Sequence, residues 1–143
     1  MINDHIKLTG ALTITKNGKV EREVKNLVVT AGKGLVASRL SSNSASVIGY
    51  MAVGTGTTAA AAGDTTLVTE LDRNALSVSG GSVSGAAITY AATWNAADGT
   101  GALTEAGLFN ASSGGTLFAR TVFAVVNKGA DDTVTISWTV TIS

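Results

Sequence analysis

The chain of 143 residues contains no cysteine and no proline. Without cysteine it can form neither a disulfide nor a thiolate zinc site, so its stability must come from packing. Without proline, its turns have to be built from glycine, of which there are 17, and from Asn, Asp and Ser. Such turns favour β-hairpins.

Charge is scarce as well. Asp, Glu, Lys and Arg make up 14% of the chain, whereas roughly 25% is usual. The 10 basic and 10 acidic residues cancel, so no positive field exists to attract nucleic acid. We therefore expect no nucleic-acid partner, and we expect part of the surface to meet another protein.

Long apolar runs are also missing. No stretch approaches the roughly 18 apolar residues of a membrane span, and Met1 to Lys7 lacks the apolar run of a signal peptide. We therefore expect no membrane partner and a protein made in the cytoplasm. The length is that of one ordinary domain, so a single domain over residues 1–143 is predicted.

Strict alternation marks the end of the chain. From Asp132 to Ser143 every second residue is apolar, which predicts a β-strand with one buried face. Similar patterns predict further strands at 6–15, 19–25, 47–53, 76–78, 88–94, 103–109 and 116–126, the first two joined by an Asn17-Gly18 turn. Seven or eight strands predict an all-β fold with one short helix: an antiparallel β-sandwich, with the jelly roll as one candidate topology.

The period changes to helical between Thr30 and Ser41, where Thr30 is a candidate N-cap. Gly32 and Gly34 each weaken this helix by up to about 1 kcal/mol relative to alanine, so it needs tertiary packing to persist. A further turn of helix is expected at 64–71, capped by Asp64.

Candidate catalytic groups are few. His5 is the only histidine and has only Asp4 as a nearby acid, so a surface role outweighs a catalytic one. Gly32-Lys33-Gly34 and Gly54-Thr55-Gly56 match neither of the common phosphate-binding patterns, and the second is expected to be a flexible strand exit. We expect no enzyme activity, no cofactor and no metal site.

Glu105 shares the phase of Leu103 and Phe109 on a predicted strand. If that face is buried the carboxylate needs a counter-ion, because an unpaired buried charge is expensive, and Arg73 or Arg120 is expected to supply it. A structural ion pair is favoured over a general acid.

Two tryptophans, Trp94 and Trp138, lie in the apolar phase of their strands. They are expected to be core aromatics rather than platforms on which a sugar stacks.

Several glycine- and threonine-rich stretches together resemble small virion proteins of tailed bacteriophages. The stretches are YMAVGTGTT at 50–58, LVTELDR at 67–73, LTEAGLF at 103–109, GTLFAR at 115–120, VVNK at 125–128 and WTVTI at 138–142, with NLVVTAG at 26–32 extending the similarity. Proteins of this group occur as capsid decoration (cement) subunits and as parts of tails or fibres. The resemblance implies a binding role, with no catalytic residues to carry over.

What the resemblance implies most directly is a capsid decoration protein on the virion surface, made in the cytoplasm of a bacterial host. Its partners would be the major capsid protein and further copies of itself, as a dimer or trimer. A tail, collar or fibre-attachment component is the alternative within phage biology, and a carbohydrate-binding β domain is the alternative of another class. The expected contact residues are Met1, Ile2, Asn3, Asp4 and His5 at the N-terminus and Thr57 and Thr58 in the 54–63 loop, because both segments lack strand alternation and could order against a neighbour.

The alternation at the end of the chain makes a first prediction. Trp138→Ala should cost about 3–5 kcal/mol of stability because it empties a core site, whereas Thr139→Ala on the opposite face should cost little. Denaturant melts of the two variants measure the difference. Equal losses would mean that the two faces of the strand are assigned wrongly.

Overall fold

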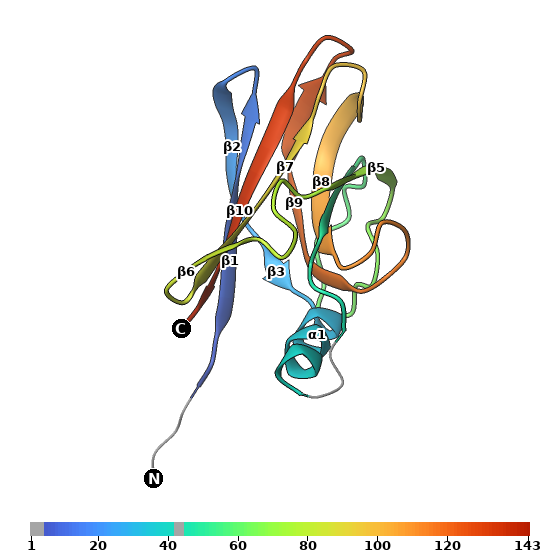
Figure 1. Cartoon of the computed structure of the whole chain (residues 1–143). Helices are drawn as coiled ribbons and strands as arrows, with labels where there is room; N and C mark the ends of the chain where they lie inside the picture. Colours follow the sequence, from blue (N-terminus) through green and yellow to red (C-terminus); the bar gives the residue numbers. More distant parts are fainter. Residues whose placement is uncertain (1–4, 42–44) are drawn as a thin grey trace.

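The structure, a computed structural model, describes residues 5–41 and 45–143 of the chain. In this part, strands form two five-stranded antiparallel sheets that pack against each other around a common apolar core (Figure 1). The predicted all-β sandwich with one short helix is therefore confirmed.

The first sheet has the order β2-β1-β10-β7-β6 and the second has the order β3-β9-β8-β4-β5. In the first sheet the strands are β1 (Leu8–Lys16), β2 (Lys19–Lys25), β6 (Ser82–Ser84), β7 (Ala87–Trp94) and β10 (Val134–Ile142). In the second sheet they are β3 (Leu27–Val28), β4 (Tyr50–Gly54), β5 (Glu70–Ala75), β8 (Gly101–Phe109) and β9 (Leu117–Lys128).

Ten strands in the described ranges exceed the seven or eight expected. The strands that sequence missed are β3 and β6, which are too short to show a period, and β5, whose charged sequence Glu70–Ala75 does not alternate. The segment 76–78, expected to be a strand, instead leads from β5 towards the turn at Gly80 and Gly81. A sandwich of ten strands in this order also differs from the eight-stranded jelly roll.

The long alternating strands lie where the pattern places them. Asn17 (φ 52°) and Gly18 (φ 81°) make the turn between β1 and β2 with the positive φ values that a tight hairpin needs. The terminal strand β10 lies between β1 and β7 in the first sheet, and its alternate residues are buried. These are Val134, Ile136, Trp138 and Val140.

The helix α1 (Thr30–Leu40) begins at Thr30 itself, so its cap position lies one residue before the predicted one. Val29 occupies the N-cap position and no side chain caps the helix, so the prediction for Thr30 is wrong. The backbone N–H of Thr30 instead donates to the carbonyl of Ala62, 2.8 Å away. Within the described residues, no helix is long and apolar enough to cross a membrane.

The helical turn expected at 64–71 is also wrong. Residues 55–69 form an irregular connection from β4 to β5, here called the 55–69 loop, and β5 begins at Glu70. Its backbone N–H groups donate in part to side chains of the second sheet instead of to a helical ladder.

The two helical glycines differ in their surroundings, and this makes a second prediction. A Cβ on Gly32 would collide with the backbone carbonyl of Phe118 in β9, whereas nothing lies within 4 Å of a Cβ on Gly34. Gly32→Ala should therefore destabilise the fold by about 1–3 kcal/mol through overpacking. Gly34→Ala should stabilise it by up to about 1 kcal/mol through helix propensity.

Thermal and denaturant melts of the two single variants measure these opposite signs. A stabilising Gly32→Ala would show that α1 does not depend on its close approach to β9.

Candidate functional site

The strand β8 contains an irregularity that decides which way Glu105 faces. The register with β9 shifts between Leu103 and Glu105, so the alternation of side chains is broken there. Leu103 packs into the core between the sheets, whereas Phe109 belongs to a separate apolar cluster with Ala52, Leu67 and Leu117. The expectation that Leu103 and Glu105 share one buried face is therefore wrong. Glu105 lies with Phe109 on the outer face of the second sheet, where the 55–69 loop covers it.

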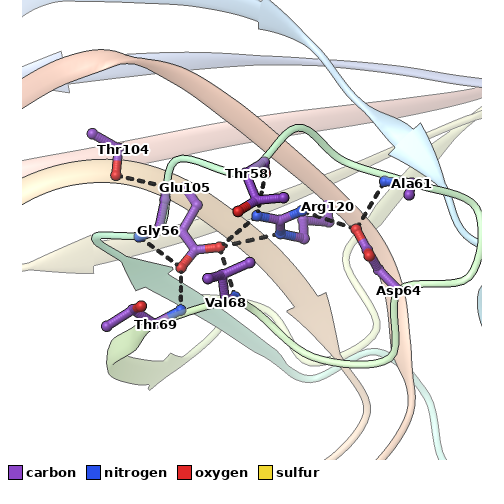
Figure 2. Close-up of polar contacts among 9 residues, drawn as sticks. All are labelled: Gly56, Thr58, Ala61, Asp64, Val68, Thr69, Thr104, Glu105 and Arg120. Atoms are coloured by element: carbon purple, nitrogen blue, oxygen red, sulfur yellow. Dashed lines mark hydrogen bonds and ion pairs between the residues drawn. The ribbon is translucent and has the colours of Figure 1, made fainter.

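The Glu105 side chain is fully buried and both carboxylate oxygens accept hydrogen bonds (Figure 2). Oε1 accepts from the backbone N–H of Gly56 (3.0 Å) and of Thr69 (2.7 Å). Oε2 accepts from the backbone N–H of Val68 (3.0 Å) and from Nε (3.1 Å) and Nη2 (2.9 Å) of Arg120. One carboxylate from β8 therefore binds both ends of the 55–69 loop and a guanidinium from β9.

Arg120 extends the network towards the middle of the loop. Its side chain is also fully buried, and Nη1 donates to Oδ2 of Asp64 at 2.9 Å while Nη2 donates to the carbonyl of Thr58 at 2.8 Å (Figure 2). Asp64 in turn accepts the backbone N–H of Ala61 on the same oxygen at 2.9 Å. We call Glu105, Arg120 and Asp64 the ionic staple, because together they fasten the loop to the sheet.

Arg73, the other expected counter-ion, lies elsewhere. Its guanidinium pairs with Glu70, at 2.7 Å between Nη2 and Oε1, and lies 3.7 Å from the centroid of the Phe109 ring. Nη1 also donates to the carbonyl of Ala111 at 2.9 Å. Arg73 is therefore not the partner of Glu105, because it projects from β5 whereas β9, which carries Arg120, is the strand beside β8.

Two glycines make room for the carboxylate. A Cβ on Gly54 would lie 2.6 Å from Oε1 of Glu105, and one on Gly56 would lie 2.5 Å from the same atom. The Gly54-Thr55-Gly56 segment is therefore not the flexible strand exit expected from sequence. It is a tight cradle for an internal carboxylate, held also by the Thr104 hydroxyl, which donates to the Gly56 carbonyl at 2.8 Å.

The charges of the staple are set by these contacts. Burial alone raises the pKa of Glu105, but the backbone N–H groups of Thr69 and Val68, the guanidinium of Arg120 and the N–H of Gly56 outweigh it and hold that pKa below its ordinary value. The backbone N–H of Ala61, with help from Arg120, likewise lowers the pKa of Asp64 against the opposing effect of burial.

The burial of Glu105 limits the chemistry of the staple. Glu105 has no exposed surface, and both of its oxygens already accept hydrogen bonds within the protein. A general acid or base must reach a substrate and must exchange a proton near the working pH. A sealed carboxylate with a lowered pKa does neither, so the geometry is that of a structural fastener.

The remaining expected residues lie as follows. Trp94 and Trp138 are fully buried, and the Trp138 indole donates to Oδ1 of Asn26 at 2.9 Å. Thr57, Thr58 and His5 are exposed. The other expected contact residues, Met1, Ile2, Asn3 and Asp4, lie outside the described residues.

Sequence did not point to a second carboxyl cluster, formed by Asp72 of β5 and Asp98 of the β7–β8 connection. Burial raises the pKa of Asp72, and hydrogen bonding to Asp98 and the charge of Asp98 raise it further. Nδ2 of Asn74 donates to Asp98 at 2.8 Å and to the carbonyl of Thr93 at 3.0 Å. Throughout residues 5–41 and 45–143, no group of three or more His, Cys, Asp or Glu side chains could hold a metal ion.

Comparisons with protein families, curated proteins and solved structures find no match to this chain. The family expected from the sequence resemblance therefore stays a prediction.

The staple makes a third prediction. Glu105→Gln should lower the free energy of unfolding by about 3–5 kcal/mol, because it removes the fully buried counter-charge of Arg120 and leaves that guanidinium only the partly exposed Asp64. The matched control is Glu70→Gln, which breaks the more exposed pair with Arg73 and should cost at most about 1 kcal/mol. Equilibrium denaturation of both variants measures the difference, and equal small losses would contradict the structural role of the staple.

Wild type and Glu105→Gln should also differ in how their stability depends on pH. Because the folded-state pKa of Glu105 lies below its unfolded value, its contribution to stability is complete above the unfolded pKa and is lost as pH falls through the folded one. The stability gap between wild type and Glu105→Gln should therefore be constant near neutral pH and should shrink under acid. A gap that widens on acidification would contradict the assigned charge.

Proposed function

We propose that this protein is a structural component of a tailed-phage virion that decorates the capsid. In this role it binds the outer surface of the assembled shell, contacts the major capsid protein and further copies of itself, and stabilises the particle without catalysing a reaction. The proposal starts from the sequence resemblance and is supported by how the structure uses the residues that carry it.

The carrying observation is that most of the resembling stretches meet in one structural unit. Residues 50–58 and 67–73 include β4, both ends of the 55–69 loop and the start of β5, while 103–109 and 115–120 are β8 and the start of β9. These segments build the second sheet and supply Glu105, Arg120 and their backbone partners. The resembling stretches of this chain therefore form a braced scaffold, which fits a binding protein better than an enzyme.

The braced loop gives this scaffold a preformed surface. Thr57 and Thr58 are exposed, yet the backbone beneath them is held by Arg120 and Glu105. The sequence suggested that this loop could become ordered against a neighbour. In the structure the loop is already held by the protein's own side chains, so binding does not have to order it. A preformed loop spends little conformational entropy on binding, which suits attachment through many weak contacts repeated over a symmetric shell.

Apolar exposure at the helix end of the sandwich supports a contact role as well. Leu40 is 84% exposed, and Val47 and Ile142 are 39% exposed, beside an apolar cavity of about 350 Å³ that these three residues help to line. Clustered apolar exposure is typical of surfaces that meet other proteins.

The alternatives differ in what they require. A tail, collar or fibre-attachment component would share this fold and differ in copy number. A carbohydrate-binding domain would need exposed aromatic side chains for stacking, and both tryptophans are buried.

Copy number in purified particles tests the proposal, as the fourth prediction. Quantitative mass spectrometry should find this chain in proportion to the major capsid protein. A few copies per particle, recovered with tails after capsid disruption, would replace decoration by the tail role.

A paired substitution locates the contact. Thr57→Arg adds bulk and charge to the exposed loop and should lower occupancy on particles without changing the unfolding midpoint of the isolated protein. The control is Ser112→Arg at an exposed site outside the loop, where occupancy should stay unchanged. Unchanged occupancy for Thr57→Arg would remove the loop from the contact surface.

A further inference from the structure

One corner of the sandwich is open between its two sheets. The beginning of β1 continues past the end of β2 and lies beside β3 and α1 (Figure 1). A groove of about 520 Å³ lies at this corner, and we call it the corner groove. Its lining includes residues 6–10 of the β1 segment, residues 25–28 around β3, and Lys33 of α1.

The β1 side of the groove presents backbone that no neighbouring strand uses. Lys7 exchanges both backbone hydrogen bonds with Ser143, at 2.7 and 2.9 Å, so the N–H and C=O groups of the next residue, Leu8, are directed away from β10. On that side the ladder with β2 starts only at Ala11, opposite Lys25, and before it the Asn26 N–H donates to the Gly10 carbonyl at 3.0 Å. Among the described residues, Leu8 therefore lacks a strand partner on the groove side.

The opposite side of the groove is also a sheet edge. β3 pairs only with β9 and ends the second sheet. Leu27 is 37% exposed, and Ile6, which extends β1, is 81% exposed. Unpaired strand edges with exposed apolar side chains are the feature that extended segments of other proteins use when they add a strand to a sheet.

The charged residues that line the groove are all basic. Lys7, Lys25 and Lys33 are all exposed and line it, and its lining includes no carboxylate. Within residues 5–41 and 45–143, none of these three lysines forms an ion pair. Three unpaired lysines at one corner of a chain with net charge zero favour a negatively charged occupant.

The arrangement of the side chains specifies the pattern of that occupant. Along a strand, successive side chains point to opposite faces of the sheet. Leu8 packs against the core, so Lys7 and Thr9 lie on the solvent face, and Lys25 shares that face because it is paired with Ala11. A strand added beside β1 would therefore place acidic residues next to Lys7 and Lys25 and apolar residues next to Leu8.

We propose that the corner groove binds an extended segment of a partner protein in which acidic and apolar residues alternate, by strand addition to the edge of the β1 segment at Ile6–Leu8. Backbone hydrogen bonds to Leu8 provide affinity, Lys7 and Lys25 select acidic side chains on one face of the segment, and Lys33 adds positive charge from α1. The inference concerns a binding site and does not require the virion role.

The test, our fifth prediction, uses a synthetic seven-residue peptide that alternates aspartate and valine, with a fluorescent label. Fluorescence anisotropy should show saturable binding that weakens as salt is added, because the lysines are exposed. A peptide with lysine in place of aspartate is the control and should not bind. Failure of the aspartate peptide, or equal binding of both peptides, would overturn the proposal.

Two variants at the ends of one strand locate the site. Lys25→Glu should weaken binding about threefold to tenfold, since it replaces an attraction by a repulsion at an exposed site. Lys19→Glu makes the same change at the other end of β2, outside the groove, and should leave affinity unchanged. An equal effect of the two variants would mean that the peptide responds to overall charge and not to the groove.

Strand addition has its own readout. In hydrogen-exchange experiments followed by NMR, the peptide should slow exchange of the Leu8 amide, and the Leu27 and Lys33 resonances should shift while those at Thr57 stay in place. Peptide binding without protection of Leu8 would contradict strand addition. Sedimentation should show a monomer that remains one with peptide; a dimer that the peptide dissociates would make a second copy of this chain the occupant and would overturn the partner proposed here.

Discussion

The buried ion pair between Glu105 and Arg120 is the constraint around which the second sheet and the 55–69 loop are arranged. Two charges removed from water are costly, and their attraction offsets that cost only when every remaining hydrogen-bonding position is filled. The backbone N–H groups of Gly56, Val68 and Thr69 fill positions that water would otherwise take. The loop therefore has its conformation because the ion pair requires those N–H groups, and the pair is tolerable because the loop supplies them.

The sequence was sufficient to predict the regular strands. A strand with one face against the core and the other in water alternates apolar and polar residues, as β10 does. The sequence could not predict which face of β8 carries Glu105, because the irregularity after Leu103 shifts the register and leaves no sign in the order of apolar and polar residues. Burial of Glu105 did imply a counter-ion. The choice between Arg73 and Arg120 depended on which strand lies beside β8, and strand order is a long-range property that local patterns do not contain.

The segment Gly54-Thr55-Gly56 shows how a binding pattern can be used internally. Glycines that let a backbone approach an anion are a feature of phosphate sites. The sequence of this segment does not match the common phosphate-binding patterns, so a phosphate site was not predicted here. Here the anion is the carboxylate of Glu105, and a side chain at either glycine would collide with it. The physical requirement of the motif is met, but its ligand belongs to the same chain. Patterns of this kind therefore report a backbone that closely surrounds negative charge, whatever its source.

The pairing of β1 with β10 has a consequence for how the chain folds. The first sheet is built on contact between strands at opposite ends of the described chain, from Leu8 opposite Ile142 to Lys16 opposite Val134. The entropy of closing so long a loop must be overcome before any of those contacts forms, whereas β4–β5 and β8–β9 pair with their sequence neighbours. High contact order of this kind is associated with folding in milliseconds to seconds instead of microseconds. The part of the second sheet formed by β4, β5, β8 and β9, with its ionic staple, can thus assemble early, whereas β3 must reach β9 from far along the chain and the first sheet can close only when the two ends of the chain meet.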